Sequence, residues 1–152
     1  FESANLRIIK KWCSNKLALD RFSPSDLIKT IKKYKINVGT NYMIGFPDET
    51  RKEIETTLNF AHKMKQNGLD HSNFFLVMPV PGTPIFDYCI KKGHLPKNYN
   101  PDKFQWTKAN LINTAVSPAE LESIRDKAWD DCNNQQFKKV RKSWVATGPS
   151  RH

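Results

Sequence analysis

Two apolar segments, each stopped by glycine or proline just before a helix-start signal, constrain the fold more than any other feature. The first is INVGTNYMIGF, residues 36–46, which is rich in β-branched and aromatic residues and is followed by Pro47. The second is SNFFLVMPV, residues 72–80, whose nearly continuous apolar run predicts a strand covered on both faces. Two such strands, each leading into a helix, predict an α/β fold with a parallel sheet.

Capping signals predict three helices around these strands. Ser23 and Thr83 would each cap a helix that has proline at its first position, and TRKE at residues 50–53 is a capping box. Gly68 and Gly93 would end the second and third helices. The residues expected to face inward, in helix order, are Leu27, Ile28, Ile31 and Tyr34; Ile54, Leu58, Ala61 and Met64; and Ile85, Phe86, Cys89 and Ile90.

The two ends of the chain add further elements to this helix–strand alternation, which is typical of right-handed crossovers between parallel strands. Residues 3–13 predict a short helix that follows a strand ending near Phe1 and Glu2. Residues 93–114 show no sustained period and predict an ordered connection. SPAE at residues 117–120 is a second capping box and begins a long helix. Its inward residues would be Leu121, Ile124, Ala128 and Trp129.

Length and composition fit one ordinary globular domain of 152 residues. No segment approaches the roughly 20 consecutive apolar residues of a membrane span, and the first residues lack a secretory-signal pattern. We therefore expect a cytoplasmic protein. The chain starts at Phe1 without a strand-start or helix-start signal, so we also expect it to be part of a longer protein.

Cysteines and histidines give no metal or disulfide pattern. Cys13, Cys89 and Cys132 lie far apart and are odd in number, and the four histidines are scattered. Neither a disulfide framework nor a local metal site can be read from these spacings, and reduced, buried thiols are the simplest interpretation. We expect no metal ligands in this chain.

A net charge of +10 is compatible with nucleic acid, an anionic substrate or an acidic partner. Many of the lysines occur in pairs on what would be solvent-facing sides of helices, which favours a solvated surface. QQFKKVRKSW, residues 135–144, is different because basic residues alternate there with aromatic and aliphatic ones. This segment keeps a second hypothesis open, a module that binds RNA or another polyanion.

Both predicted strands end in tight turns, where parallel α/β folds commonly bind ligands. Gly45 would allow a special backbone dihedral or the close approach of a ligand, while Asp48 and Glu49 lie at the start of the next helix. The second strand ends in MPVPGT, residues 78–83. Ordinary α/β architecture uses the same residues in such turns, so a binding role and a purely structural role both remain open.

Three motifs in order resemble the C-terminal half of radical S-adenosylmethionine (SAM) enzymes. They are FES at residues 1–3, NYMIGFPDET at residues 41–50 and FFLVMPVPGTPIFDYC at residues 74–89. The resemblance is greatest to members that carry an N-terminal cobalamin-binding domain. FQWTKANLINTAVSPAEL, residues 104–121, also looks like the segment that follows the barrel in that group.

The resemblance implies a partial (β/α)6 barrel of the TIM type, with a C-terminal helical extension. Residues 1–95 would form the C-terminal part of the barrel, namely the end of its fourth strand and its fifth and sixth αβ units. Residues 96–152 would form the connection and the helical extension. Such a piece would leave an unpaired strand edge that the remainder of the enzyme must cover.

The resemblance also implies nine positions that contact SAM and no catalytic acid, base or nucleophile among them. Asn41 stands where the family motif on the fifth strand has glycine, and Met43 replaces isoleucine. The implied positions are Glu2 and Ser3 after the fourth strand; Asn41, Met43, Gly45 and Glu49 against the adenine; and Val77, Met78 and Pro79, which would use mainly backbone groups.

The CxxxCxxC loop that holds the four-iron, four-sulfur cluster in this family does not occur in the sequence. The cluster ligands would therefore lie outside this chain, and the chain alone would be catalytically inert. The implied cofactors are SAM, the 4Fe-4S cluster and, as a further candidate, cobalamin. The implied partners are the rest of the same enzyme and an unidentified small-molecule substrate. A polyanion-binding module and an α/β scaffold without a cofactor remain the alternatives.

Overall fold

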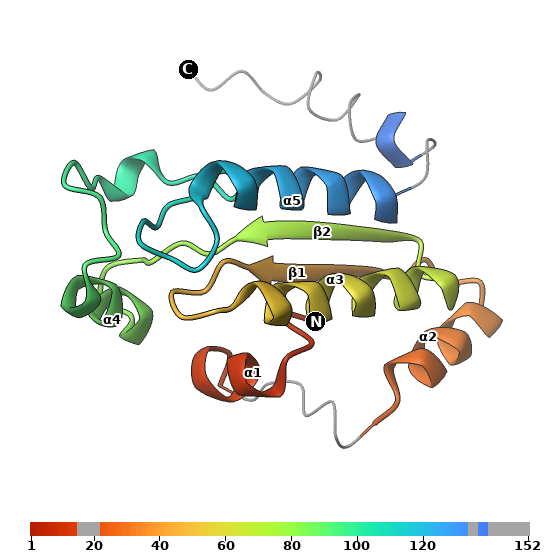
Figure 1. Cartoon of the computed structure of the whole chain (residues 1–152). Helices are drawn as coiled ribbons and strands as arrows, with labels where there is room; N and C mark the ends of the chain where they lie inside the picture. Colours follow the sequence, from red (N-terminus) through yellow and green to blue (C-terminus); the bar gives the residue numbers. More distant parts are fainter. Residues whose placement is uncertain (15–21, 134–136, 140–152) are drawn as a thin grey trace.

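The computed structural model describes residues 1–14, 22–133 and 137–139, which form a mixed α/β unit (Figure 1). Its helices and strands alternate between residues 24 and 92, as the sequence predicts. In chain order the elements are α1 (Leu6–Trp12), α2 (Pro24–Lys33), β1 (Gly39–Ile44), α3 (Arg51–Gln66), β2 (His71–Leu76), α4 (Pro84–Lys92), the 3-10 turn η1 (Pro101–Lys103) and α5 (Pro118–Cys132).

β1 and β2 form a parallel pair, which confirms the predicted strand direction. The register runs from Gly39 opposite His71 to Ile44 opposite Leu76, so the two strands begin and end together. Figure 1 shows both arrows pointing the same way, and α3, which connects the two strands in the chain, lies beside the sheet. The carboxyl ends of the strands therefore meet at one edge of the sheet, and the segments that follow them lie side by side.

Among the described residues, the two faces of the sheet differ in burial, and one of them is fully covered. α3 and α5 pack on this covered face and enclose Tyr42, Ile44, Phe74 and Leu76. Side chains alternate along a strand, so the intervening residues of β1 and β2 point to the opposite face, called here the open face. The prediction that the second strand is covered on both faces is wrong, because β2 alternates between buried and half-buried residues. The open face of the described residues carries Asn41, Met43, Asn73 and Phe75.

The capping predictions hold for α2, α3 and α4, whose caps are Ser23, Thr50 and Thr83. Thr50 and Glu53 form a complete capping box. The box predicted for α5 is only half formed. The Ser117 side chain accepts a hydrogen bond from the Glu120 N–H, but the Glu120 carboxylate pairs instead with Arg51 of α3. This ion pair joins the two helices of the covered face.

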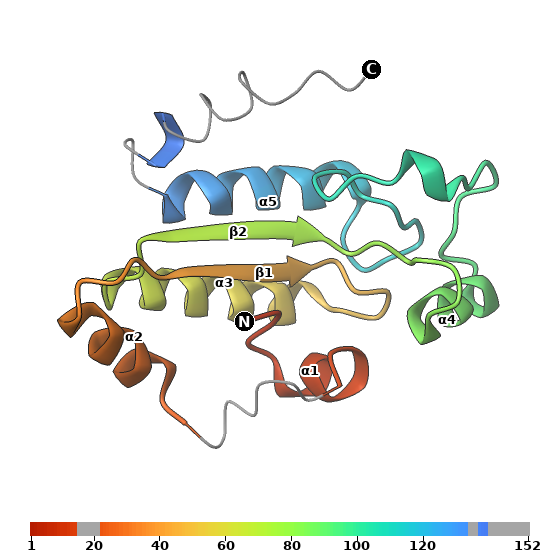
Figure 2. The ribbon, with the colours of Figure 1, turned by 180° about the vertical axis from the view of Figure 1, so that it is seen from behind.

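Several residues predicted to face inward are exposed. Leu27 and Tyr34 at the two ends of α2 are 46% and 74% exposed, and Ile90 of α4 is 57% exposed. Figure 2 shows the physical reason, since α2 and α4 lie beyond opposite ends of the sheet and not over it. α2 consequently buries little beyond Ile28, which packs with Met64 and Leu69.

A non-strand segment borders each edge of the two-stranded sheet. Residues 1–3 are not assigned to a strand, but the Glu2 carbonyl accepts a hydrogen bond of 2.6 Å from the Met43 N–H, so the predicted strand end lies beside β1. On the other edge, the Trp106 carbonyl accepts one of 2.8 Å from the Leu76 N–H of β2. The predicted connection thus runs along β2. The described residues establish an α/β fold, and the partial barrel stays a prediction.

No helix among the described residues is long and apolar enough to cross a membrane.

Candidate functional site

The candidate site is the carboxyl edge of the sheet, where residues 45–50 follow β1 and residues 77–83 follow β2. We call these two segments the rim. Gly45 begins the first segment with φ of +83°, a value that side chains other than glycine rarely adopt. A Cβ at Gly45 would also lie under 3.0 Å from the Leu121 side chain of α5. The dihedral and the packing of α5 therefore each favour glycine at this position.

Glu49 folds back under this turn. Its Oε2 accepts hydrogen bonds from the Gly45 N–H at 2.7 Å and the Phe46 N–H at 3.2 Å, and the residue is only 2% exposed. Oε1 is buried without a hydrogen-bond partner among the described residues. Burial raises the pKa of Glu49 to about 7, although both backbone hydrogen bonds favour the ionised form. Glu49 therefore stabilises the turn from inside.

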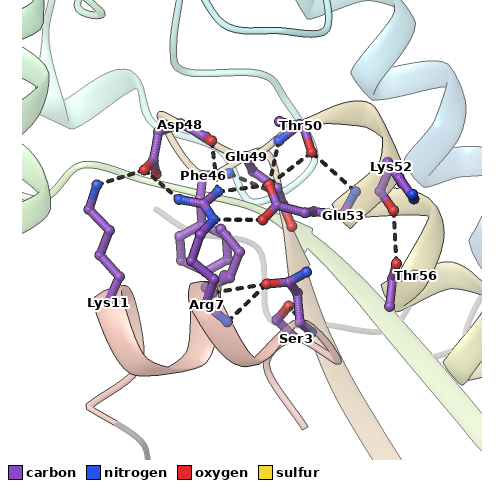
Figure 3. A network of polar contacts seen from close by, with 12 residues as sticks. Ser3, Arg7, Lys11, Phe46, Asp48, Glu49, Thr50, Lys52, Glu53 and Thr56 are labelled. Carbon is purple, nitrogen blue, oxygen red and sulfur yellow. Dashed lines mark hydrogen bonds and ion pairs between the residues drawn. The ribbon is translucent and has the colours of Figure 1, made fainter.

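Asp48 points the other way and binds α1 (Figure 3). Its carboxylate accepts hydrogen bonds from Arg7 at 2.7 Å, from Lys11 at 2.6 Å and from the Trp12 indole N–H at 2.8 Å. Arg7 also binds both carboxylate oxygens of Glu53, at 2.6 and 2.7 Å. Sequence reasoning placed Asp48 near the start of a helix but did not reveal this network, because its partners are distant in sequence.

Ser3 and Glu2, two of the predicted SAM contacts, lie beside β1. Ser3 is 1% exposed, and its hydroxyl lies 3.1 Å from that of Thr57 on α3 and accepts a hydrogen bond from the Asn5 N–H. Glu2 is half-buried, and its backbone carbonyl is bonded to Met43. The Ser3 hydroxyl thus joins the first residues to α3.

Asn41 and Met43 both lie on the open face. The Asn41 Oδ1 accepts a hydrogen bond of 3.1 Å from the Asn73 Nδ2 on β2. Met43 is half-buried against the cluster that contains Phe46 and Val77. The register of the two strands also places Phe75 opposite Met43. Asn73 and Phe75 are not among the candidate site residues that the sequence predicts. Strand alternation could have identified them, because each lies directly opposite a predicted residue.

Backbone carbonyls at the end of β2 are engaged within the protein. The Val77 carbonyl accepts a hydrogen bond from the Asn110 side chain, and the Pro79 carbonyl accepts one from the Tyr99 hydroxyl, each at 3.2 Å. The Met78 carbonyl accepts one from the Val80 N–H at 3.0 Å. These bonds hold the second rim segment against the connection.

Backbone hydrogen bonds join the predicted positions into one region. The Val77 N–H donates to the Ile44 carbonyl at 3.2 Å, and the Met43 N–H donates to Glu2. A cavity of about 390 Å³ beside β1 is lined by residues that include Glu2, Ser3 and Asn41. The structure thus brings the strand ends together, while the Ser3 hydroxyl and the Glu49 Oε2 are bonded to nearby protein groups.

Metal ligands are not assembled within the described residues, where no group of three or more His, Cys, Asp or Glu could hold an ion. Cys13, Cys89 and Cys132 are all buried, as predicted. Burial raises the pKa of both the Cys89 and Cys132 thiols to about 11, so both are protonated near neutral pH. Their burial suits packing in the core.

Most of the predicted basic segment, residues 135–144, lies outside the described residues. Lys138 is described, and its ammonium lies 2.8 Å from the Asp130 carboxylate and 5.6 Å from the Trp129 ring centroid. This lysine is therefore engaged with α5, and polyanion binding by the segment stays a prediction.

Comparison with known proteins identifies relatives that are enzymes. No family model matches the chain. It is 42% identical over 65 residues to an uncharacterized methyltransferase of Pyrococcus horikoshii, a match covering 43% of the chain and 14% of the relative. It is 34% identical over 83 residues to the tRNA-2-methylthio-N(6)-dimethylallyladenosine synthase of Coxiella burnetii, a match covering 55% of the chain and 18% of the relative. It is 30% identical over 121 residues to the bacteriochlorophyllide d C-12(1)-methyltransferase of Chlorobaculum tepidum, a match covering 80% of the chain and 24% of the relative.

The matched part of the chain therefore spans less than a quarter of each of these relatives. The similarity shows that the chain is related to parts of methyltransferases and of a tRNA-modifying synthase.

Proposed function

We propose that this chain is the C-terminal part of a radical SAM enzyme and forms one wall of its SAM pocket. The observation that carries the proposal is the parallel pairing of β1 and β2, which aligns their carboxyl ends at one edge. The relatives support it, because two are methyltransferases and the third is a tRNA methylthio-modifying synthase. The same proposal includes the partial barrel over residues 1–95 and the helical extension over residues 96–152.

The open face has the chemistry to fit an adenosyl group. Met43 and Phe75 are half-buried and lie opposite each other, so they offer an apolar surface to the flat faces of a purine. The exposed Asn41 amide offers hydrogen bonds beside them. A mostly apolar surface with a few polar groups is typical of small-molecule sites. Ser3, Gly45 and Glu49 would act indirectly, by holding the segments that carry the contacts.

An iron–sulfur cluster does not fit the described residues, because the cysteines are buried and no cluster of ligands exists there. When bound, such a cluster supplies the electron that cleaves SAM, and its ligands would belong to another part of the enzyme. Cobalamin would likewise be held elsewhere. We expect residues 1–152 alone to bind at most part of SAM and to be inert.

The test uses the intact protein encoded by the complete gene, purified without oxygen. The proposal predicts a brown protein that cleaves SAM to 5′-deoxyadenosine when a reductant is added. Asn41→Ala should weaken SAM binding several-fold, whereas Asn59→Ala, an exposed position on α3, should not. A gene that encodes no upstream cysteine triplet, together with no SAM cleavage, would contradict the proposal. RNA binding that weakens steeply with salt and needs residues 135–144 would favour the polyanion-binding alternative.

A further inference from the structure

The guanidinium of Arg7 donates to four acceptor atoms and ties α1 both to the first rim segment, at Asp48, and to the first turn of α3, at Glu53. Its Nε and Nη2 bind the two Glu53 carboxylate oxygens, and its Nη1 binds the Asp48 carboxylate. Nη2 also donates to the Asp48 backbone carbonyl at 2.9 Å. We call Arg7, Asp48 and Glu53 the Arg7 fork. A planar group that donates in three directions fixes the spacing and the orientation of the segments it joins.

Two further α1 residues, Lys11 and Trp12, converge on the same Asp48 carboxylate. Partial burial would raise the pKa of Asp48, but the hydrogen bonds from Lys11, Trp12 and Arg7 outweigh it and lower the pKa to about 2. The hydrogen bond from Arg7 is the main reason that the pKa of Glu53 is lowered to about 2. Both carboxylates are therefore ionised, and the fork is complete, throughout the neutral range.

Stability alone accounts poorly for this arrangement. The Arg7 side chain is 45% exposed and that of Lys11 is 38% exposed, and ion pairs of this kind contribute only about 0–1 kcal/mol each. The Arg7 fork instead fixes the position of α1 relative to the first rim segment. It joins α1, which follows Ser3, to the turn in which Glu49 accepts a hydrogen bond from the Gly45 N–H. Two segments predicted to contact SAM are therefore held at a fixed distance from each other.

We propose that Arg7 is a positioning residue for SAM, which sets the spacing between the Glu2–Ser3 segment and the first rim segment without touching the ligand. This inference rests on the proposed function. Arg7 acts through Asp48 and Glu53, and Trp12 supports it by orienting the Asp48 carboxylate.

The experiment measures the dissociation constant of S-adenosylhomocysteine for the intact protein by calorimetry. Arg7→Ala and Arg7→Lys should both raise this constant about tenfold, because one ammonium cannot reproduce the three-way contact. Lys32→Ala is the matched control, since Lys32 also bridges a helix to an aspartate, and that aspartate, Asp70, directly precedes β2 at the opposite end of the sheet. This control should change the constant less than twofold.

The outcomes separate the positioning role from the proposed function. If the unmodified protein does not bind S-adenosylhomocysteine, the proposed function itself fails. If it binds and both Arg7 variants bind equally well, the positioning role is overturned. Full rescue by Arg7→Lys would also overturn it, since a charge without the fork would then suffice. If Arg7→Ala does not fold, the dissociation constants of the Arg7→Lys and Trp12→Phe variants are compared instead. If both variants bind S-adenosylhomocysteine as tightly as the unmodified protein, the proposal is contradicted.

Discussion

The two ends of the sheet use an aspartate in different ways. At the amino end, Asp70 binds Lys32 of α2 at 2.8 Å and accepts a hydrogen bond from the Val38 N–H at 2.7 Å. At the carboxyl end, the Asp48 carboxylate accepts hydrogen bonds from three side chains of α1. A second carboxylate, that of Glu49, is buried within the same turn. Among the described residues, Asp70 forms one ion pair, whereas Asp48 belongs to a network.

This difference indicates which end depends on polar contacts. Beside Asp70, Ile28, Met64 and Leu69 form a buried apolar cluster that holds α2 in place. α1 also buries Ile8 and Ile9, but the turn it contacts is defined by hydrogen bonds. We therefore expect the amino end to tolerate loss of its ion pair and the carboxyl end to be sensitive to changes in its turn.

Gly45→Ala should have the largest effect on stability. The new methyl group would meet Leu121 and force an unfavourable dihedral, with an expected loss of about 3 kcal/mol in the free energy of unfolding. Gly82→Ala is the matched control, because Gly82 has the same φ of +83° but a Cβ added there would meet nothing within 4 Å. Urea denaturation should show a loss of about 1 kcal/mol for this control. Equal losses would show that the packing of α5 on the turn is unimportant.

Glu49→Gln should make stability less dependent on pH. The folded-state pKa of about 7 exceeds the ordinary value of 4.5, so the folded protein retains a proton that the unfolded chain releases between these values. Stability should therefore fall as pH rises from about 4.5 to about 7. The variant avoids this loss, and urea denaturation should find it more stable than the unmodified protein by on the order of 2 kcal/mol at alkaline pH. An unchanged pH profile would contradict the buried, titrating carboxyl.

Asp48→Asn and Asp70→Asn compare the two ends directly. We expect Asp48→Asn to lower the free energy of unfolding by about 1.5 kcal/mol near neutral pH, after allowance for solvent screening, and Asp70→Asn by about 0.5 kcal/mol. Because the pKa of Asp48 is lowered to about 2, its contribution should disappear as pH falls from about 4 to about 2. Thermal denaturation at several pH values measures this. A larger loss for Asp70→Asn would reverse the comparison.

Ser3→Ala should have a smaller effect, about 1 kcal/mol, because it removes a buried hydroxyl hydrogen bond to Thr57. Thr57→Val is the complementary variant, and the double variant should cost less than the sum of the two single changes. Strict additivity in urea denaturation would show that the two hydroxyls do not act as a pair.

Local signals in the sequence predicted the elements well. The TRKE capping box, the glycine after β1 and the proline-bounded strand ends each determine structure through nearby residues, and the parallel strand direction followed from their order. The one-sided burial of β2 was not predictable from its apolar run, because it depends on where α3 and α5 pack. Phe74 and Phe75 are identical residues with different environments for this reason.

The candidate site was predicted only in part. Asn41 and Met43 lie on the open face at the expected strand, but Ser3 bonds to Thr57, which is 54 residues away. The Arg7 fork joins residues 41 and 46 positions apart. No local spacing encodes such contacts, since they arise only when the fold brings α1 to the rim.

The central claim is that the two strand ends form one surface against a nucleoside. The chain has three methionines, of which Met43 and Met78 lie at the strand ends and Met64 lies buried near the amino end. Methyl NMR of the intact protein labelled at methionine therefore tests the claim when S-adenosylhomocysteine is added. We predict that the Met43 and Met78 signals move together while the Met64 signal stays unchanged. Ligand binding that leaves Met43 and Met78 unmoved, or shifts Met64 equally, would contradict the claim.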